Sequence, residues 1–165
     1  MKHLLALGMT ALLATNISAK EEALGVSVQG EPTIYFSFEL DNGLRIEPSV
    51  LFNKSKDSGD ITYEYETYQL LLGVFKVKQH TDKTSIFYGS RMGYIAYHSK
   101  STYAYSEDEH NEGYKIEPTI GFEYKLVDNF SISADASINY SNVNGKGTTD
   151  QNTYTDTEVS VRYYF

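Results

Sequence analysis

Hydrophobic and polar positions alternate with a period of two over most of this chain. The clearest segment is the sixth of eight, where Tyr114, Ile116 and Ile120 share one face while Lys115 and Glu117 share the other. Such alternation indicates a strand with two different faces, because successive side chains of a strand point to opposite sides. After the first twenty residues we find no convincing 3.6-residue helical repeat. We therefore expect an all-β chain, with strands at residues 23–29, 32–40, 44–54, 66–78, 85–97, 113–126, 130–142 and 155–165.

An internal repeat supports an arrangement of hairpins. Residues 31–36 (EPTIYF) and residues 117–122 (EPTIGF) match in register, and each segment leads into an Asp-Asn turn. The first of these turns, Asp-Asn-Gly at 41–43, is a strong short-range signal for a β-hairpin because Asn and Gly tolerate positive φ. We interpret the turn at 128–129 as its equivalent.

The connections between the expected strands alternate between short and long. Short turns fall at 41–43, 79–84 and 127–129, whereas longer polar segments fall at 55–65, 98–112 and 143–154. Transmembrane β-barrels have short periplasmic turns and longer extracellular loops, so this alternation fits a membrane barrel. Tyr63 and Tyr65 are out of phase with Tyr68, and we therefore assign them to the loop at 55–65.

The N-terminus predicts export. A short basic start at residues 1–3 precedes an apolar stretch at residues 4–13, and Ile-Ser-Ala at 17–19 forms a plausible cleavage site. This is the anatomy of a secretory signal peptide, and the stretch is too short to span a membrane as a helix. We expect a signal peptide at residues 1–19 followed by one domain at residues 20–165.

Composition narrows the class of protein. The chain has 22 acidic and 14 basic residues and a formal net charge of −8, which disfavours nucleic acid as a partner. It has no cysteine, so disulfides and thiolate chemistry are excluded. No stretch after the signal approaches the roughly 18 apolar residues of a spanning helix. A helical membrane protein is therefore not expected.

Aromatic residues are abundant, with 15 tyrosines, 8 phenylalanines and no tryptophan. A barrel model places outward-facing aromatics at both ends of the strands with aliphatic residues between them, as in the aromatic girdles of outer-membrane barrels. Alternation alone does not say which face is inside, and a lipocalin-type barrel would place its apolar face inward. The girdles, the signal peptide and the terminal aromatic residue favour the membrane barrel.

The last residues of the chain resemble a known sequence signal. Their outward-facing positions look like the C-terminal assembly signal of bacterial outer-membrane β-barrels, and they are Val159, Val161, Tyr163 and Phe165. Residues 87–94 (FYGSRMGY) resemble an aromatic-x-Gly-x-Arg-x-Gly-Tyr strand of the small barrels of OmpA/OmpX type and opacity type, and residues 127–132 (VDNFSI) resemble their turn into the penultimate strand. The resemblance covers roughly residues 22–165.

This resemblance implies an eight-stranded antiparallel up-and-down transmembrane β-barrel in the cell outer membrane. It also implies partners: outer-membrane lipids and lipopolysaccharide around the wall, and the barrel assembly machinery that reads the C-terminal signal. Barrels of this size share architecture more than activity, so function needs a separate argument.

The inward-facing positions carry a set of opposite charges. We expect a charge network in the lumen formed by Arg45, Glu47, Arg91, Glu123, Asp135, Glu158 and Arg162. Eight strands enclose only enough space for side chains, and buried charges must be paired. Arg91 lies near mid-depth, where Glu47, Asp135 and Glu158 can reach it, and Gly89, Gly93 and Gly121 are expected to leave room for such a partner. We favour a closed plug over a gated path for ions or protons.

Nothing in the sequence supports catalysis. His80, His98 and His110 are assigned to turns or loops, and no acidic residue at a fixed offset completes a catalytic set. The acidic run at 107–112 lacks the glycine and the alternate spacing of a calcium loop. We therefore expect a non-enzymatic protein without cofactor or metal. Two functions stay open: envelope structure or surface interaction through the loops at 55–65, 98–112 and 143–154, and a narrow porin-like channel for ions or small solutes.

Overall fold

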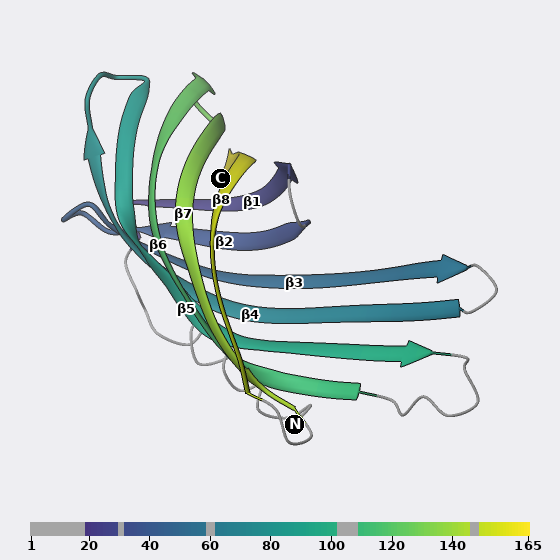
Figure 1. Ribbon diagram of the computed structural model, residues 1–165. Helices are drawn as coiled ribbons and strands as arrows, with labels where there is room; N and C mark the ends of the chain where they lie inside the picture. Colours follow the sequence, from purple (N-terminus) through teal and green to yellow (C-terminus); the bar gives the residue numbers. More distant parts are fainter. Residues whose placement is uncertain (1–18, 30–31, 59–61, 102–108, 146–148) are drawn as a thin grey trace.

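The computed structural model describes residues 19–29, 32–58, 62–101, 109–145 and 149–165, and these residues form eight strands and no helix. Each strand pairs antiparallel with its neighbours in the sequence, and β1 pairs with β8, which closes a barrel (Figure 1). The predicted eight-stranded up-and-down barrel is confirmed. The strands are β1 Glu21–Gln29, β2 Thr33–Glu39, β3 Leu44–Ser58, β4 Thr62–Gln79, β5 Thr84–Ser101, β6 Glu109–Val127, β7 Phe130–Asn144 and β8 Thr149–Tyr164.

Three strand pairs are longer than the sequence predicted, and most of the expected outer loops at 55–65, 98–112 and 143–154 is strand. The prediction was wrong because it stopped the strands where their apolar face ends. Pairing continues beyond that level, from Lys56 with Glu64 to Ser99 with Glu109, without a break in register. Tyr63 and Tyr65 belong to β4, and they are out of phase with Tyr68 because they lie on its inner face.

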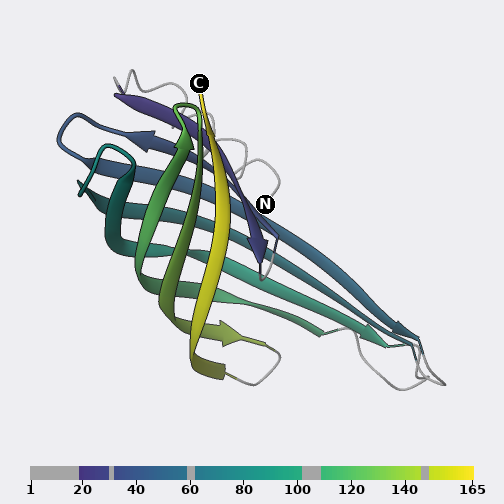
Figure 2. The same cartoon turned by 90° about the horizontal axis from the view of Figure 1, so that it is seen from above.

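The two short strands leave one side of the barrel lower than the other. β1 and β2 span 9 and 7 residues, whereas β4, β5 and β6 span 18, 18 and 19 residues. Figures 1 and 2 show β3 to β6 running well beyond β1 and β2 at one end of the molecule. We call residues 52–58, 62–68, 96–101 and 109–114 the projecting sheet.

The opposite end carries the short turns and the C-terminus. Gly43 has a φ of 71°, a left-handed conformation that glycine adopts without strain. Its N–H donates to the carbonyl of Leu40 at 2.8 Å, and the N–H of Leu44 donates to Asn42 Oδ1 at 2.9 Å. The Asp-Asn-Gly segment thus forms the hairpin turn that its sequence predicted, which places the paired outer ends of β3 and β4 at the other end of the barrel.

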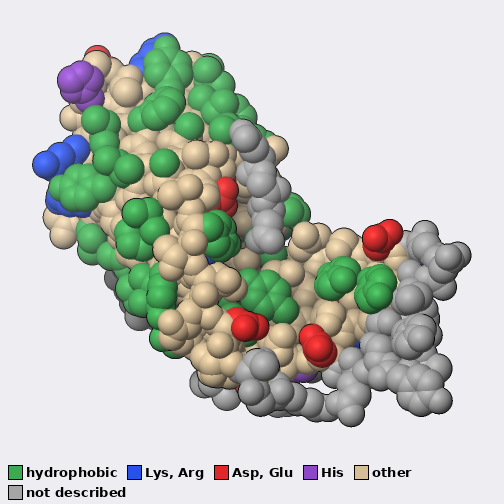
Figure 3. All heavy atoms as spheres, viewed as in Figure 1, with side chains coloured by type: hydrophobic (Ala, Val, Ile, Leu, Met, Phe, Trp, Pro, Cys, Tyr) green, Lys and Arg blue, Asp and Glu red, His purple; other side chains and the backbone are tan. Residues whose placement is uncertain are grey.

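The outside of the barrel is apolar and exposed. Large hydrophobic side chains alternate with buried ones along the strands, and Figure 3 shows them spread over the barrel wall. Aromatic rings gather toward the projecting end, where Phe52 and Tyr68 lie 5.0 Å apart and Tyr114 and Tyr140 lie 6.4 Å apart between ring centroids. No helix among the described residues is long and apolar enough to cross a membrane.

Candidate functional site: the charged lumen

Four charged side chains meet in the half of the lumen nearer the short turns. Arg162 on β8 donates to Glu47 Oε1 on β3 at 2.9 Å and to Glu123 Oε2 on β6 at 2.8 Å. Arg45 on β3 lies 2.8 Å from the same oxygen of Glu123 and 3.0 Å from Glu39 Oε2. These four members of the predicted network are brought together because all occupy inward positions at matching depth on three strands.

Hydroxyl groups complete the coordination of these carboxylates. Ser37 donates to Glu47, whereas Ser131 and Tyr164 donate to Glu123. Glu47, Glu123 and Arg162 are each at most 2 % exposed, so their charges depend on these contacts for stabilisation. The cluster is a packed ionic layer and not a lining around water.

Aromatic rings pack between the guanidinium groups, which the sequence analysis missed. Arg162 lies 5.0 Å from the ring centre of Tyr35 and 5.5 Å from that of Phe87, and Arg91 lies 5.2 Å from that of Phe75. The two phenylalanine rings contact each other edge to face at 5.7 Å. Cations over ring faces are stabilised by the aromatic quadrupole, and the rings also occupy lumen volume. The signal in the sequence was their phase, since each ring sits at an inward position of its strand.

Glycines make room for these rings. A Cβ atom at Gly25 would lie 2.1 Å from the ring of Tyr35, and one at Gly121 would lie 2.4 Å from the ring of Phe87. The expectation that Gly89, Gly93 and Gly121 leave room for a carboxylate is therefore largely wrong. Gly89 faces Phe75 and Gly93 faces the backbone of β4, although a Cβ at Gly121 would also meet Asp135, at 2.6 Å.

A second charge group lies nearer the projecting end. Arg91 on β5 donates to Glu117 at 3.4 Å and to Asp135 at 3.2 Å, and Lys115 lies 3.1 Å from Glu117. Of the expected partners of Arg91, only Asp135 is in place.

The other two expected partners of Arg91 are engaged differently. Glu47 binds Arg162 instead, because both lie in the cluster nearer the short turns. Glu158 makes no ion pair with any residue that the structure describes.

Two cavities lie on opposite sides of the Arg162 cluster, toward the two ends of the lumen. One of about 180 Å³ lies at the end with the short turns and is bordered by Arg45, Glu123 and those turns. The other, of about 40 Å³, lies on the far side and is bordered by Glu47, Arg91 and Glu158. Arg162 borders neither cavity, and its side chain with its carboxylate and aromatic partners occupies the space between them.

Comparisons with known proteins identify the architecture. No protein-family model and no curated protein match the sequence. Among solved structures, Neisserial surface protein A is similar at a TM-score of 0.61 and 14% identity, covering 88% of this chain and 94% of that one. A major outer membrane protein from Thermus thermophilus gives 0.55 and 11% identity over 88% and 98%. Ail of Yersinia pestis gives 0.54 and 15% identity over 88% and 94%.

The chain has the fold of the small bacterial outer-membrane β-barrels. A wall that exposes a continuous apolar surface is unstable in water and requires lipid. The fold and this surface together place the protein in the outer membrane. At these identities the likeness shows the fold and leaves ligands and activity open.

The expected assembly signal lies on the outside of this outer-membrane barrel. Val159, Val161, Tyr163 and Phe165 alternate with buried residues along the last strand. Phe165 is 72% exposed, and its N–H donates to the carbonyl of Glu22 at 3.2 Å. The side chain is therefore free to be recognised while the backbone closes the barrel against β1.

The histidines lie away from the lumen charges. His98 and His110 pair across β5 and β6 on the outer face of the projecting sheet, with ring centres 6.0 Å apart. His110 Nε2 lies 3.8 Å from Glu112, and His80 sits in a short turn. Among the described residues no cluster of three metal-ligating side chains is present. Residues 102–108, which include part of the acidic run, lie outside the described residues.

Proposed function

We propose that this outer-membrane barrel is a non-enzymatic protein with a closed lumen, which acts in envelope structure or in surface interaction through its outer hairpins. The observation that carries the closed lumen is the Arg162 cluster, in which two buried carboxylates and two aromatic rings surround one guanidinium group. A buried ionic cluster of this kind holds a lumen shut, because opening it would separate buried charges that stabilise one another.

The outer hairpins support a role at the cell surface. β3 to β6 extend beyond the girdle rings as a continuous polar sheet, which presents paired, ordered side chains to the medium. Two proteins with this fold carry names that point to the surface, a Neisserial surface protein and an attachment invasion locus protein. Lipopolysaccharide and outer-membrane lipids surround the wall in this proposal, and the assembly machinery reads the residues at the end of β8.

A narrow channel is the second candidate. The cavities that enter from both ends favour it, since the Arg162 cluster lies between them. Any conduction would require this layer to rearrange.

Conductance in a planar lipid bilayer tests the proposal. We expect no steady current from the purified wild-type barrel. Arg162→Ala, checked for folding by its migration on unheated gels, should show increased current because water enters where the guanidinium group was. Lys54→Ala on the projecting sheet is the matched control and should stay closed. Large, stable, ion-selective openings from the wild type would replace the closed barrel with the channel.

A further inference from the structure

Charges on the projecting sheet are sorted between its two faces. Across the inner face, register brings Ser55, Tyr65, Ser99 and Glu109 into one row. The next rows place Asp57 beside Tyr63, and Asn53 and Thr67 beside Tyr97 and Asn111. The described side chains of this face are acidic, aromatic or uncharged.

The outer face of the same sheet holds the cations. One row consists of Lys54, Glu66, His98 and His110, and the next of Lys56, Glu64 and Lys100. Two of these lysines are paired with the acids beside them, Lys54 with Glu66 at 2.7 Å and Lys56 with Glu64 at 3.1 Å, and Lys100 lies next to Glu64 in the register. The hydrogen bond from Lys54 lowers the pKa of Glu66 below its ordinary value. The outer face is thus internally neutralised and the inner face is not.

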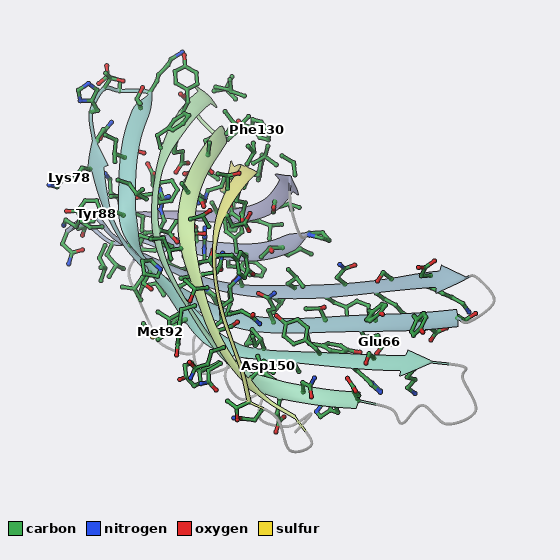
Figure 4. All side chains as sticks on the ribbon, viewed as in Figure 1. Glu66, Lys78, Tyr88, Met92, Phe130 and Asp150 are labelled. Carbon is green, nitrogen blue, oxygen red and sulfur yellow. The ribbon has the colours of Figure 1, made fainter. Side chains whose placement is uncertain are left out.

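The outer half of β8 extends the acidic inner face. Asp150, Asp156 and Glu158 share the inward phase of β8 with Asn152 and Tyr154. Asp150 is labelled near the outer end of β8 in Figure 4, and its pairing with Val143 places it on the lumen side. We call this surface, made of the inner face of the projecting sheet and of residues 149–158, the acidic trough. The first cation below it is Lys115, which is engaged by Glu117.

The tyrosines of the trough are exposed rather than packed. Tyr65 and Tyr154 are 48% and 49% exposed, and the rings of Tyr63 and Tyr65 stack with centres 6.3 Å apart. In Figure 3 the face of the projecting sheet turned to the reader shows green and red side chains and scarcely any blue. Exposed tyrosines next to carboxylates attract cations, through the ring faces and through direct ion pairs.

Two strand edges border the trough without a partner strand among the described residues. Pairing of β2 with β3 ends at Thr33 and Leu51, and pairing of β1 with β8 ends at Gln29 and Val159. Residues 52–58 and 149–158 therefore have a neighbouring strand on one side only. An edge of this kind offers backbone N–H and C=O groups to an added strand.

We propose that the acidic trough binds an extended, lysine- or arginine-rich peptide segment, which adds as a strand along the edge of β8. The free edge supplies main-chain hydrogen bonds, while the acids and tyrosines of the inner face receive the basic side chains that alternate on one side of the peptide. Because β1 and β2 are short, they leave the space for the added strand. A polyanion would be repelled by the same surface. This inference rests on the proposed surface role and names the chemistry of its partner.

A binding assay with synthetic peptides tests the inference. The folded full-length mature barrel in lipid nanodiscs is titrated with a labelled ten-residue peptide that alternates Lys and Thr, and binding is followed by fluorescence anisotropy. We expect saturable binding that weakens as salt is raised, and at least tenfold weaker binding to a Glu-Thr peptide. A Lys-Thr peptide with alternate backbone nitrogens methylated should also bind at least tenfold more weakly, because it cannot extend the sheet.

Matched variants locate the site. Asp150→Asn with Asp156→Asn removes two charges from the inward phase of β8, along which the peptide adds, and should weaken binding about tenfold. Glu64→Gln with Glu66→Gln removes the same charge from the opposite face of the same sheet and should leave binding unchanged. Equal loss in both variants, or equal binding of the methylated peptide, would overturn the trough as a strand-addition site. Conductance is measured separately, so the barrel can prove closed while this partner is refuted, or the reverse.

Discussion

At the scale of single residues, the cost of burying charge explains the interior of this barrel. Arg162 is 1% exposed and has two carboxylate partners, so each of the three charges depends on the others. The sequence revealed which charges point inward, because inward phase is readable from alternation. It did not reveal which charges pair, since pairing depends on depth and register across strands distant in sequence, and Glu47 therefore joins Arg162 instead of Arg91.

Removing Arg162 should destabilise the barrel strongly. Arg162→Ala leaves Glu47 and Glu123 buried with one fewer cation, and we expect the free energy of unfolding to fall by about 3–5 kcal/mol. Urea unfolding in lipid vesicles, followed by gel migration, measures this change. The double variant Arg162→Met, Glu47→Gln should recover much of the loss, because it removes both partners of the ion pair between Arg162 and Glu47 and leaves Glu123 paired with Arg45. A small loss in the single variant would mean that water enters the lumen and solvates the carboxylates.

At the scale of strands, the alternation of apolar and polar residues predicts that a strand exists better than it predicts where the strand ends. The eight strands were predicted because apolar faces alternate, but the ends of β3 to β8 were not, because both faces become polar above the girdle. Tyr63 and Tyr65 illustrate the difficulty. Their change of phase looks like a loop in the sequence, whereas cross-strand pairing with Asp57 and Ser55 continues the strand. The pairing register between neighbouring strands therefore defines strand ends that the sequence of one strand does not reveal.

The end of β8 allows recognition to be separated from stability. Phe165 closes the chain with a mostly exposed ring, so Phe165→Ala should change the unfolding free energy of the purified barrel little more than Phe122→Ala, whose ring is 52% exposed on the barrel wall. In cells, only Phe165→Ala should lower the amount of folded barrel in the outer membrane and induce envelope stress. Quantitative blots of heated and unheated membrane samples measure the folded fraction. Equal levels for both variants would remove Phe165 from the assembly signal.

At the scale of the whole molecule, the two surfaces of the barrel wall have different roles. The outward face is apolar over the barrel, as the exposed side chains of Ile120, Phe122 and Ile138 illustrate, and it demands lipid. Lys78 and Tyr88 point away from the barrel in Figure 4, and Lys78 lies over the tyrosine ring at 5.5 Å. The inward face carries the buried ion pairs and the aromatic rings packed against them, and above the membrane it becomes the acidic trough. The same alternation of apolar and polar residues therefore encodes both the surface that contacts lipid and the acidic trough.

This division predicts how the intact protein behaves in cells and on gels. Because the strands form a closed hydrogen-bonded ring with an apolar exterior, the folded protein should fractionate with the outer membrane and need detergent for extraction. The closed ring should also resist dodecyl sulfate without heating, so unheated and boiled samples should migrate differently. The Arg162→Ala variant should lose this difference at a lower temperature than the wild type, because the ionic layer joins β3, β6 and β8 across the lumen. Recovery of the wild type as a periplasmic monomer without detergent would contradict the membrane assignment, whatever the fate of the variant.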